Sequence, residues 1–137
     1  MNDTVELHLP ARLEFVGHAA ALCRHFCRQC GASLDDDASY AVELSVSEAC
    51  TNAVKYGKVE AGRAPEVIVQ FTLRDTALEI AVLSRGPAFS LEDIPPPDFD
   101  KHPPGGYGLY LIISQMDRVR LTHVDGWNRL IMEKERH

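Results

Sequence analysis

Glu48 and Asn52 are two polar residues whose types and spacing suit chemistry. They stand four residues apart in a segment of helical periodicity, and residues at that spacing lie one above the other on a helix face. A carboxylate placed there can accept a proton, and an amide oxygen can ligate a hard cation such as Mg²⁺. Because polar residues at helical spacing more often form a solvated face, the pair by itself does not establish a site.

A glycine cluster farther along the chain adds a second candidate group. Gly105-Gly106-Tyr107-Gly108 precedes a short apolar helix predicted from Leu109 to Gln115. Glycines without a Cβ let backbone N–H groups approach a phosphate closely, and the helix that follows adds the positive end of its dipole. Together with the carboxylate and the amide, the cluster favours a nucleotide site.

The segment from Ser84 to Pro104 lies between the two groups and is rich in proline. Proline at that density excludes a regular element. Loops of this length in compact domains are usually functional or disordered. We therefore expect a long loop over the site.

Apolar residues at helical spacing predict two helices that must position the first pair, from Leu13 to about Cys30 and from about Ala38 to Lys55. Gly31 and Gly57 follow them as stops. The acidic triplet at 35–37 is expected to cap the second helix. The stripe expected to enter the core is Val42, Val46, Ala49 and Ala53. The carboxylate–amide pair then lies at the margin of the buried face.

Five strands are predicted by alternating or short apolar runs. They span residues 4–9, 66–73, 77–83, 118–123 and 128–134. A short turn joins the second predicted strand to the third, and another joins the fourth to the fifth. Such turns favour hairpins, and hairpins favour a mostly antiparallel sheet. We expect an α+β fold, a two-layer α/β sandwich with the helices on one face, formed by residues 1–137 as one domain.

Charge and hydropathy exclude several classes of function. The formal net charge of −6 repels the phosphate backbone, so direct binding of nucleic acid is not expected. No apolar run approaches the roughly 18–20 residues of a membrane span, and the N-terminus lacks the pattern of a secretory signal. A cytoplasmic location and no membrane partner are the expectation.

The cysteines raise the question of a metal site. Cys23, Cys27 and Cys30 fall on one helical stripe, with His18 and His25 nearby. Zinc is one interpretation, but zinc ligands usually converge from separate elements. Free cysteine otherwise behaves as a small buried apolar residue, which we favour here, and disulfides are not expected in a reducing compartment.

The stretch from Glu43 to Gly57, with Ser47-Glu48-Ala49-Cys50-Thr51-Asn52-Ala53 at its centre, resembles the N-box of bacterial anti-sigma-factor serine kinases. These proteins belong to the ATPase group shared by sensor histidine kinases, gyrase and MutL. The opening strand, the Arg12-Leu13-Glu14-Phe15 helix start, the 105–117 segment and the last strand also fit. The resemblance therefore covers nearly the whole chain and implies a Bergerat-type ATP-binding fold.

The resemblance also implies roles for individual residues. Asn52 would hold the Mg²⁺ that bridges the ATP phosphates, and Glu48 would be the general base for an attacking serine hydroxyl. Residues 90–104 would form the ATP lid. The residues implied to contact ATP are Asn52, Lys55, Ser84, Gly86, Gly105, Gly106, Tyr107, Gly108 and Leu109.

Departures from the family pattern lie mainly at the adenine end. Ser84 stands where the family carries an aspartate that accepts the adenine amino group, and Ala88 stands where it carries a second glycine. Because a hydroxyl cannot supply charge, we predict weaker or less adenine-selective nucleotide binding. Tyr56 replaces a frequent histidine, and Trp127-Asn128 replaces a frequent Gly-Thr pair; both changes are interpreted as peripheral.

Three functions remain to be compared. The resemblance implies an anti-sigma factor, usually a homodimer, that sequesters a sigma factor and phosphorylates a serine on a STAS-type antagonist. The alternative is a module that binds without efficient catalysis; Ser84 and Ala88 favour it, whereas Glu48 and Asn52 oppose it. A sensor histidine kinase would need a helical hairpin for its phosphoacceptor histidine, and the chain has no room for one.

Overall fold

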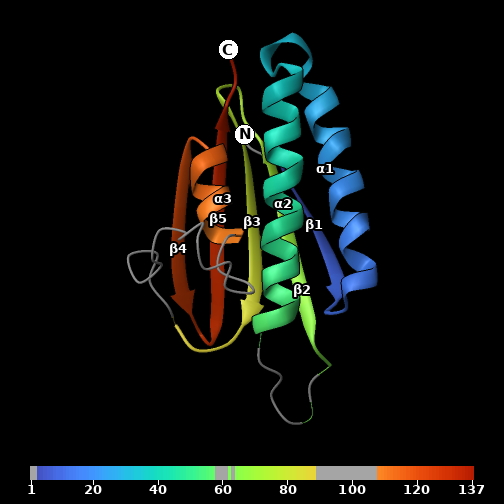
Figure 1. Ribbon diagram of the computed structural model, residues 1–137, viewed down its shortest axis with the longest axis vertical. Coiled ribbons are helices and arrows are strands. Elements are labelled where there is room, and N and C mark those ends of the chain that lie inside the picture. Colours follow the sequence, from blue (N-terminus) through green and yellow to red (C-terminus); the bar gives the residue numbers. More distant parts are fainter. Residues whose placement is uncertain (1–2, 58–61, 63, 89–107) are drawn as a thin grey trace, which may run out of the picture.

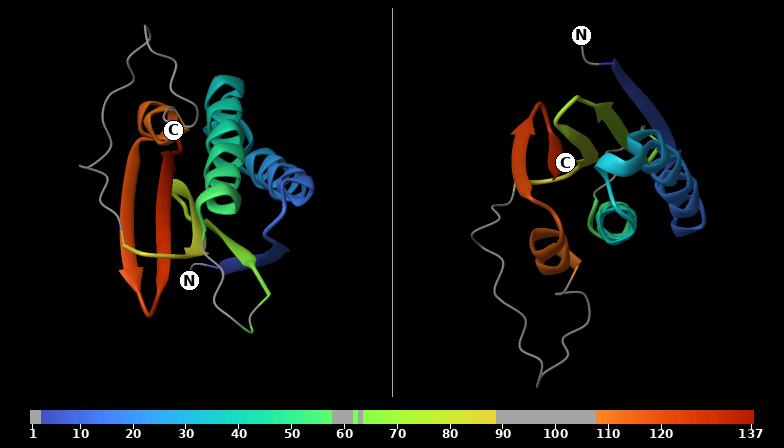
Figure 2. Two further views of the ribbon diagram at one scale, coloured as in Figure 1. Left: turned by 60° about the horizontal axis from the view of Figure 1, so that its bottom comes forward. Right: turned by 90° about the horizontal axis from the view of Figure 1, so that it is seen from above.

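The computed structural model describes residues 3–57, 62, 64–88 and 108–137. Five strands form one antiparallel sheet in the order β1-β2-β3-β5-β4. Figure 1 and Figure 2 show helices α1, α2 and α3 together on one face of this sheet. The expected two-layer α+β architecture is therefore confirmed.

The bounds of the elements agree with the sequence patterns to within a few residues. The strands are β1 (Asp3–Pro10), β2 (Glu66–Leu73), β3 (Ala77–Arg85), β4 (Arg118–Val124) and β5 (Trp127–Glu135). The α-helices are α1 (Val16–Cys30), α2 (Asp36–Tyr56) and α3 (Gly108–Gln115), and short 3₁₀ turns cover Leu13–Phe15 and Gly31–Ser33. The first predicted helix thus begins with a 3₁₀ turn rather than as a continuous α-helix.

One boundary error affects the site. The long loop was predicted to begin at Ser84, but β3 continues through Ser84 and Arg85. The ladder extends because these residues pair with Asn128 and Trp127 at the start of β5. Ser84 is therefore held on the sheet, in a fixed register.

Helix α2 starts and stops where its capping residues dictate. The Asp35 carboxylate accepts a hydrogen bond from the Ala38 backbone N–H at 2.8 Å, as predicted for the acidic triplet. At the other end the Gly57 N–H donates to the Ala53 carbonyl. A Cβ on Gly57 would lie only 2.5 Å from that carbonyl oxygen, so the close approach itself requires glycine.

The core lies between the helices and the sheet. The predicted stripe of α2, at Val42, Val46, Ala49 and Ala53, is buried. The four cysteines are also buried and unpaired, as expected for small apolar side chains, and burial raises the pKa of the Cys50 thiol to about 12. In the described part of the chain, no helix is both long and apolar enough to span a membrane.

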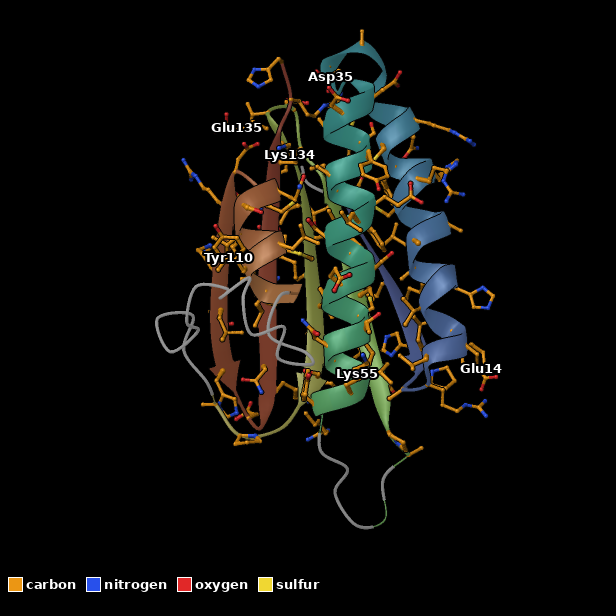
Figure 3. The ribbon with its side chains drawn as sticks, in the orientation of Figure 1. Glu14, Asp35, Lys55, Tyr110, Lys134 and Glu135 are labelled. Atoms are coloured by element: carbon orange, nitrogen blue, oxygen red, sulfur yellow. The ribbon has the colours of Figure 1, made fainter. Side chains whose placement is uncertain are left out.

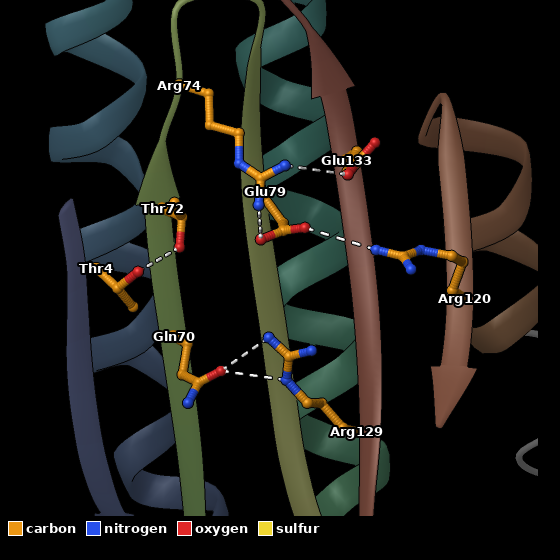
Figure 4. A network of polar contacts seen from close by, with 8 residues as sticks. All are labelled: Thr4, Gln70, Thr72, Arg74, Glu79, Arg120, Arg129 and Glu133. Atoms are coloured by element: carbon orange, nitrogen blue, oxygen red, sulfur yellow. Dashed lines mark hydrogen bonds and ion pairs between the residues drawn. The ribbon is translucent and has the colours of Figure 1, made fainter. Parts of the chain in front are cut away.

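The opposite face of the sheet carries no helix among the described residues and is covered by long polar side chains (Figure 4). Glu79 lies between Arg74, at 3.1 Å, and Arg120, at 3.8 Å. The Gln70 amide oxygen accepts two hydrogen bonds from the Arg129 guanidinium, each 3.2 Å long. Ion pairs and hydrogen bonds join the strands on this face, beside the buried apolar pair Ala81 and Ile131.

Candidate functional site

Glu48, Asn52 and Gly108 meet where α2 packs against the start of α3. A Cβ added to Gly108 would lie 2.7 Å from Asn52 Nδ2 and 3.0 Å from Glu48 Oε2. The first residue of α3 therefore approaches both candidate side chains more closely than any residue with a Cβ could without displacing them. Both side chains are half-buried, which confirms their predicted place at the margin of the core.

The contact between α2 and α3 continues away from this point into the core. Ile112, one turn after Gly108, is fully buried. Ser45, on the same stripe of α2 as Glu48 and Asn52, is also fully buried, and its hydroxyl has no hydrogen-bond partner in the described part of the chain. Ser45, Glu48 and Asn52 thus form a polar row along α2. The Glu48 and Asn52 end of this row packs against the start of α3.

The end of β3 lies beside the C-terminal end of α2. A Cβ on Gly57 would be 3.6 Å from the Arg85 carbonyl oxygen, which places the end of the helix against the end of the strand. Figure 3 shows α2 running from Asp35 at one end of the molecule to Lys55 at this end. Lys55 is exposed in the last turn of the helix, and Leu109 packs partly buried against the core from α3.

Gly86 follows β3, and its backbone groups are both engaged. Its N–H donates to the Gly126 carbonyl at 3.3 Å, and its carbonyl is 3.1 Å from His123 Nε2. These contacts attach the end of β3 to the β4–β5 hairpin. Gly86 therefore shapes this end of the sheet, and its N–H is already used within the fold.

Gly105, Gly106 and Tyr107, together with the predicted lid at 90–104, lie outside the described residues. Gly108 is the only member of the predicted glycine cluster within them, and it stands as the first residue of α3 rather than just before the helix. The helix N-terminus thus lies directly against the carboxylate and the amide of α2.

Asn128 is a residue of this region that the sequence analysis treated as peripheral. It lies opposite Ser84 in the β3–β5 ladder and is only 5% exposed. Its position could have been inferred from the strand period, because Leu130 and Met132, at alternating positions after it, are core residues. A buried asparagine on a core-facing row needs an explanation beyond packing.

The residues present fit a magnesium-bound nucleotide phosphate. Carboxylate and amide oxygens are the ligand types that Mg²⁺ prefers. A helix N-terminus that begins with glycine offers free N–H groups to an anion. The absence of a Cβ at Gly108 leaves the backbone close to the two side chains, so a phosphate held there would lie within reach of both.

Comparison with known proteins identifies the family of this chain. The family described as "Histidine kinase-like ATPase domain" matches residues 9–134. The serine-protein kinase RsbW of Bacillus licheniformis is 35% identical over 127 residues, which cover 87% of this chain and 78% of that protein. RsbW of Bacillus velezensis is 30% identical over 132 residues, which cover 90% and 81% of the two chains.

A solved structure supports the fold. The crystal structure of the RsbU and RsbW domains of a Mycobacterium tuberculosis protein aligns with a TM-score of 0.67, at 18% identity. The alignment covers 97% of this chain and 33% of that one. On the family match and the identity to curated relatives, the chain belongs to the histidine kinase-like ATPase domain family and, within it, to the RsbW group of serine-protein kinases.

Proposed function

We propose that this protein is an anti-sigma factor with serine kinase activity, which uses Mg-ATP to phosphorylate a serine on a STAS-type antagonist. The observation that carries the proposal is the convergence of Glu48 and Asn52 on Gly108, at the N-terminus of α3. A general base, a cation ligand and an anion-binding helix start are the parts that phosphoryl transfer needs.

Each residue has a defined task in the proposed reaction. Glu48 accepts the proton of the serine hydroxyl as its oxygen attacks the γ-phosphorus, and the bond from that phosphorus to the β–γ bridging oxygen breaks to release ADP. Asn52 would hold Mg²⁺ through its amide oxygen, and the bound ion would neutralise phosphate charge. The α3 N-terminus at Gly108 orients the phosphates through backbone N–H groups.

The regulatory consequence follows from charge. A phosphoserine adds about −1.5 to −2 charges at neutral pH, and such a change in a docking surface weakens a complex by repulsion and desolvation. Unphosphorylated antagonist would hold this protein away from its sigma factor, and phosphorylation would release it to sequester sigma. We place this exchange in the cytoplasm, with the single 1–137 domain acting as a homodimer.

The second candidate function is sequestration without efficient catalysis. Ser84 and Ala88 favour it, because both depart from the family at the adenine end. Under this alternative the protein binds sigma and antagonist, and nucleotide plays no catalytic part. The two functions differ in one observable, which is transfer of phosphate to the antagonist.

The test combines the purified protein with a STAS-type antagonist, MgCl₂ and ATP labelled at the γ-phosphate. The kinase predicts labelled phosphoserine on the antagonist, lost in Glu48→Gln and on chelation of Mg²⁺. A stable complex with no label in wild type would establish the pure binder instead. Labelling that persists undiminished in Glu48→Gln would remove the assigned base.

A further inference from the structure

Asn128 and Ser84 form a polar pair on the helix-bearing face of the sheet. They lie directly opposite each other on β5 and β3. Side chains alternate between faces along a strand, and Leu130 and Met132, which share a face with Asn128, belong to the core cluster under the helices. The pair therefore lies on the floor of the site, next to the end of α2.

The amide of Asn128 is only half satisfied. Its Nδ2 donates a hydrogen bond to the Pro87 carbonyl oxygen at 3.0 Å. This bond fixes the orientation of the amide, because the reverse orientation would set Oδ1 against a carbonyl oxygen. Oδ1 is buried and has no hydrogen-bond partner within the described ranges.

The polar side chains next to Oδ1 do not donate a hydrogen bond to it. His123, opposite Asn128 on β4, directs Nε2 to the Gly86 carbonyl. The Ser84 hydroxyl does not donate to Oδ1 either, so the acceptor is left for a donor from outside the described residues. Bulk water does not reach this atom, and an unpartnered buried acceptor is destabilising until a donor enters beside it.

We propose that Asn128 Oδ1 accepts a hydrogen bond from the exocyclic amine of adenine, and so takes over base recognition from the aspartate that Ser84 replaces. The proposal rests on the proposed function, because it assumes that the nucleotide is ATP. Residues opposite each other in a ladder have Cβ atoms only about 4.5–5.5 Å apart. The acceptor for adenine thus lies on β5 in this protein, one strand away from the family's position on β3, and belongs to the same site.

Selectivity for adenine follows from the chemistry of Asn128 Oδ1. Nδ2 is already bound to Pro87, so the unpartnered atom of the side chain, Oδ1, can only accept a hydrogen bond. An amine at the 6-position of the purine supplies the missing donor, whereas the 6-oxo group of inosine or guanosine nucleotides would bring a second acceptor against Oδ1. Sites built to bond a specific N–H reject analogues that lack it. The protein is therefore adenine-selective despite the loss of the carboxylate.

The experiment measures binding rather than turnover. Titration calorimetry with Mg²⁺ gives the Kd of ATP and of inosine triphosphate for wild type, Asn128→Leu, Asn128→Asp and Ser84→Ala. Wild type should prefer ATP by about tenfold or more, and Asn128→Leu should reduce that preference to near unity, mainly through weaker ATP binding. Ser84→Ala should retain most of the preference.

Asn128→Asp separates recognition from structural support. It keeps an acceptor but loses the donor to Pro87, so it should retain the preference for ATP if Oδ1 reads the base. If Asn128→Asp loses the preference as Asn128→Leu does, Asn128 acts only by holding Pro87, and the proposal is wrong. Circular dichroism checks folding, and where Asn128→Leu does not fold, Asn128→Val, which also lacks an acceptor, takes its place.

The nucleotide affinities of the wild type distinguish failure of this proposal from failure of the proposed function. Equal affinity for ATP and inosine triphosphate would overturn base recognition by Asn128 and leave the kinase intact. A preference for ATP that persists in folded Asn128→Leu would also overturn base recognition by Asn128 without affecting the proposed kinase. No measurable binding of either nucleotide would overturn the proposed function and this proposal together.

Discussion

The two ends of the site are built differently. At the phosphate end, Glu48 and Asn52 come from one helix and close against Gly108 of another, with the residue types of the family retained. At the base end, Ser84 and Asn128 come from two neighbouring strands, and both differ from the family pattern. In the proposed kinase, phosphoryl transfer and base recognition would therefore depend on separate elements, so that one could change while the other is kept.

This separation has a physical basis. A general base and a metal ligand must be placed with a precision of a fraction of an ångström, because small misplacement reduces the rate greatly. Base recognition needs only an acceptor at the right point of a rigid floor, and adjacent strands offer equivalent positions. The base end can exchange a carboxylate for an amide on the next strand more easily than α2 can move Glu48.

The largest expected effect is loss of the base at the phosphate end. Glu48→Gln keeps the shape of the side chain and removes proton acceptance, so kcat should fall by about 10²- to 10⁴-fold. ATP affinity, measured by calorimetry, should stay near that of wild type. If the variant retains full kcat, Glu48 is not the base. Proton acceptance could then no longer be assigned to the phosphate end of the site through this residue.

Gly108→Ala should have the next largest effect. Its Cβ would need to displace the side-chain ends of Asn52 and Glu48, which lie within 3.0 Å of the position it would take. These ends can move, so unfolding temperature should change little, but misplacement should lower kcat/KM by about 10- to 100-fold. Gly17→Ala on α1 is the matched control, because its Cβ would meet no atom within 4 Å.

Ser84→Asp tests the base end in the opposite direction. Restoring the carboxylate should tighten ATP binding several-fold, since a charged hydrogen bond is roughly twice as strong as a neutral one. The maximal rate at saturating ATP should not change, because the phosphate end is untouched. Equal ATP affinities for wild type and variant would show that this position no longer contacts the base.

The smallest effect is expected far from both ends. Asp35→Ala removes the N-cap of α2 and should lower the free energy of unfolding by about 1 kcal/mol, as measured by urea denaturation. Nucleotide affinity should be unchanged, since the cap is at the opposite end of the helix from Lys55 (Figure 3). Asp35→Ser, which preserves a capping oxygen, should recover most of the loss; failure to recover would point to another role for the carboxylate.

The sequence by itself determined the elements and the place of the candidate phosphate-end residues on them. Strand and helix periods, glycine stops and an acidic cap are local signals, so they predicted the five strands, the main helices and the placing of Glu48 and Asn52 at a core margin. The residue types also favoured one nucleotide site made of this pair and the glycine cluster before α3, and the structure gives the distances at Gly108.

Only the tertiary structure decided the base end. Ser84 was expected in a loop. The strand period alone could have placed Asn128 on a core-facing row, but nothing local to either residue shows that β3 and β5 are neighbours. Pairing between strands far apart in the chain extends β3 to Arg85 and sets Asn128 opposite Ser84. The bond to Pro87 then leaves Oδ1 unpartnered among the described residues. Register and hydrogen-bond direction are properties of the folded sheet, which the period of a single strand does not contain.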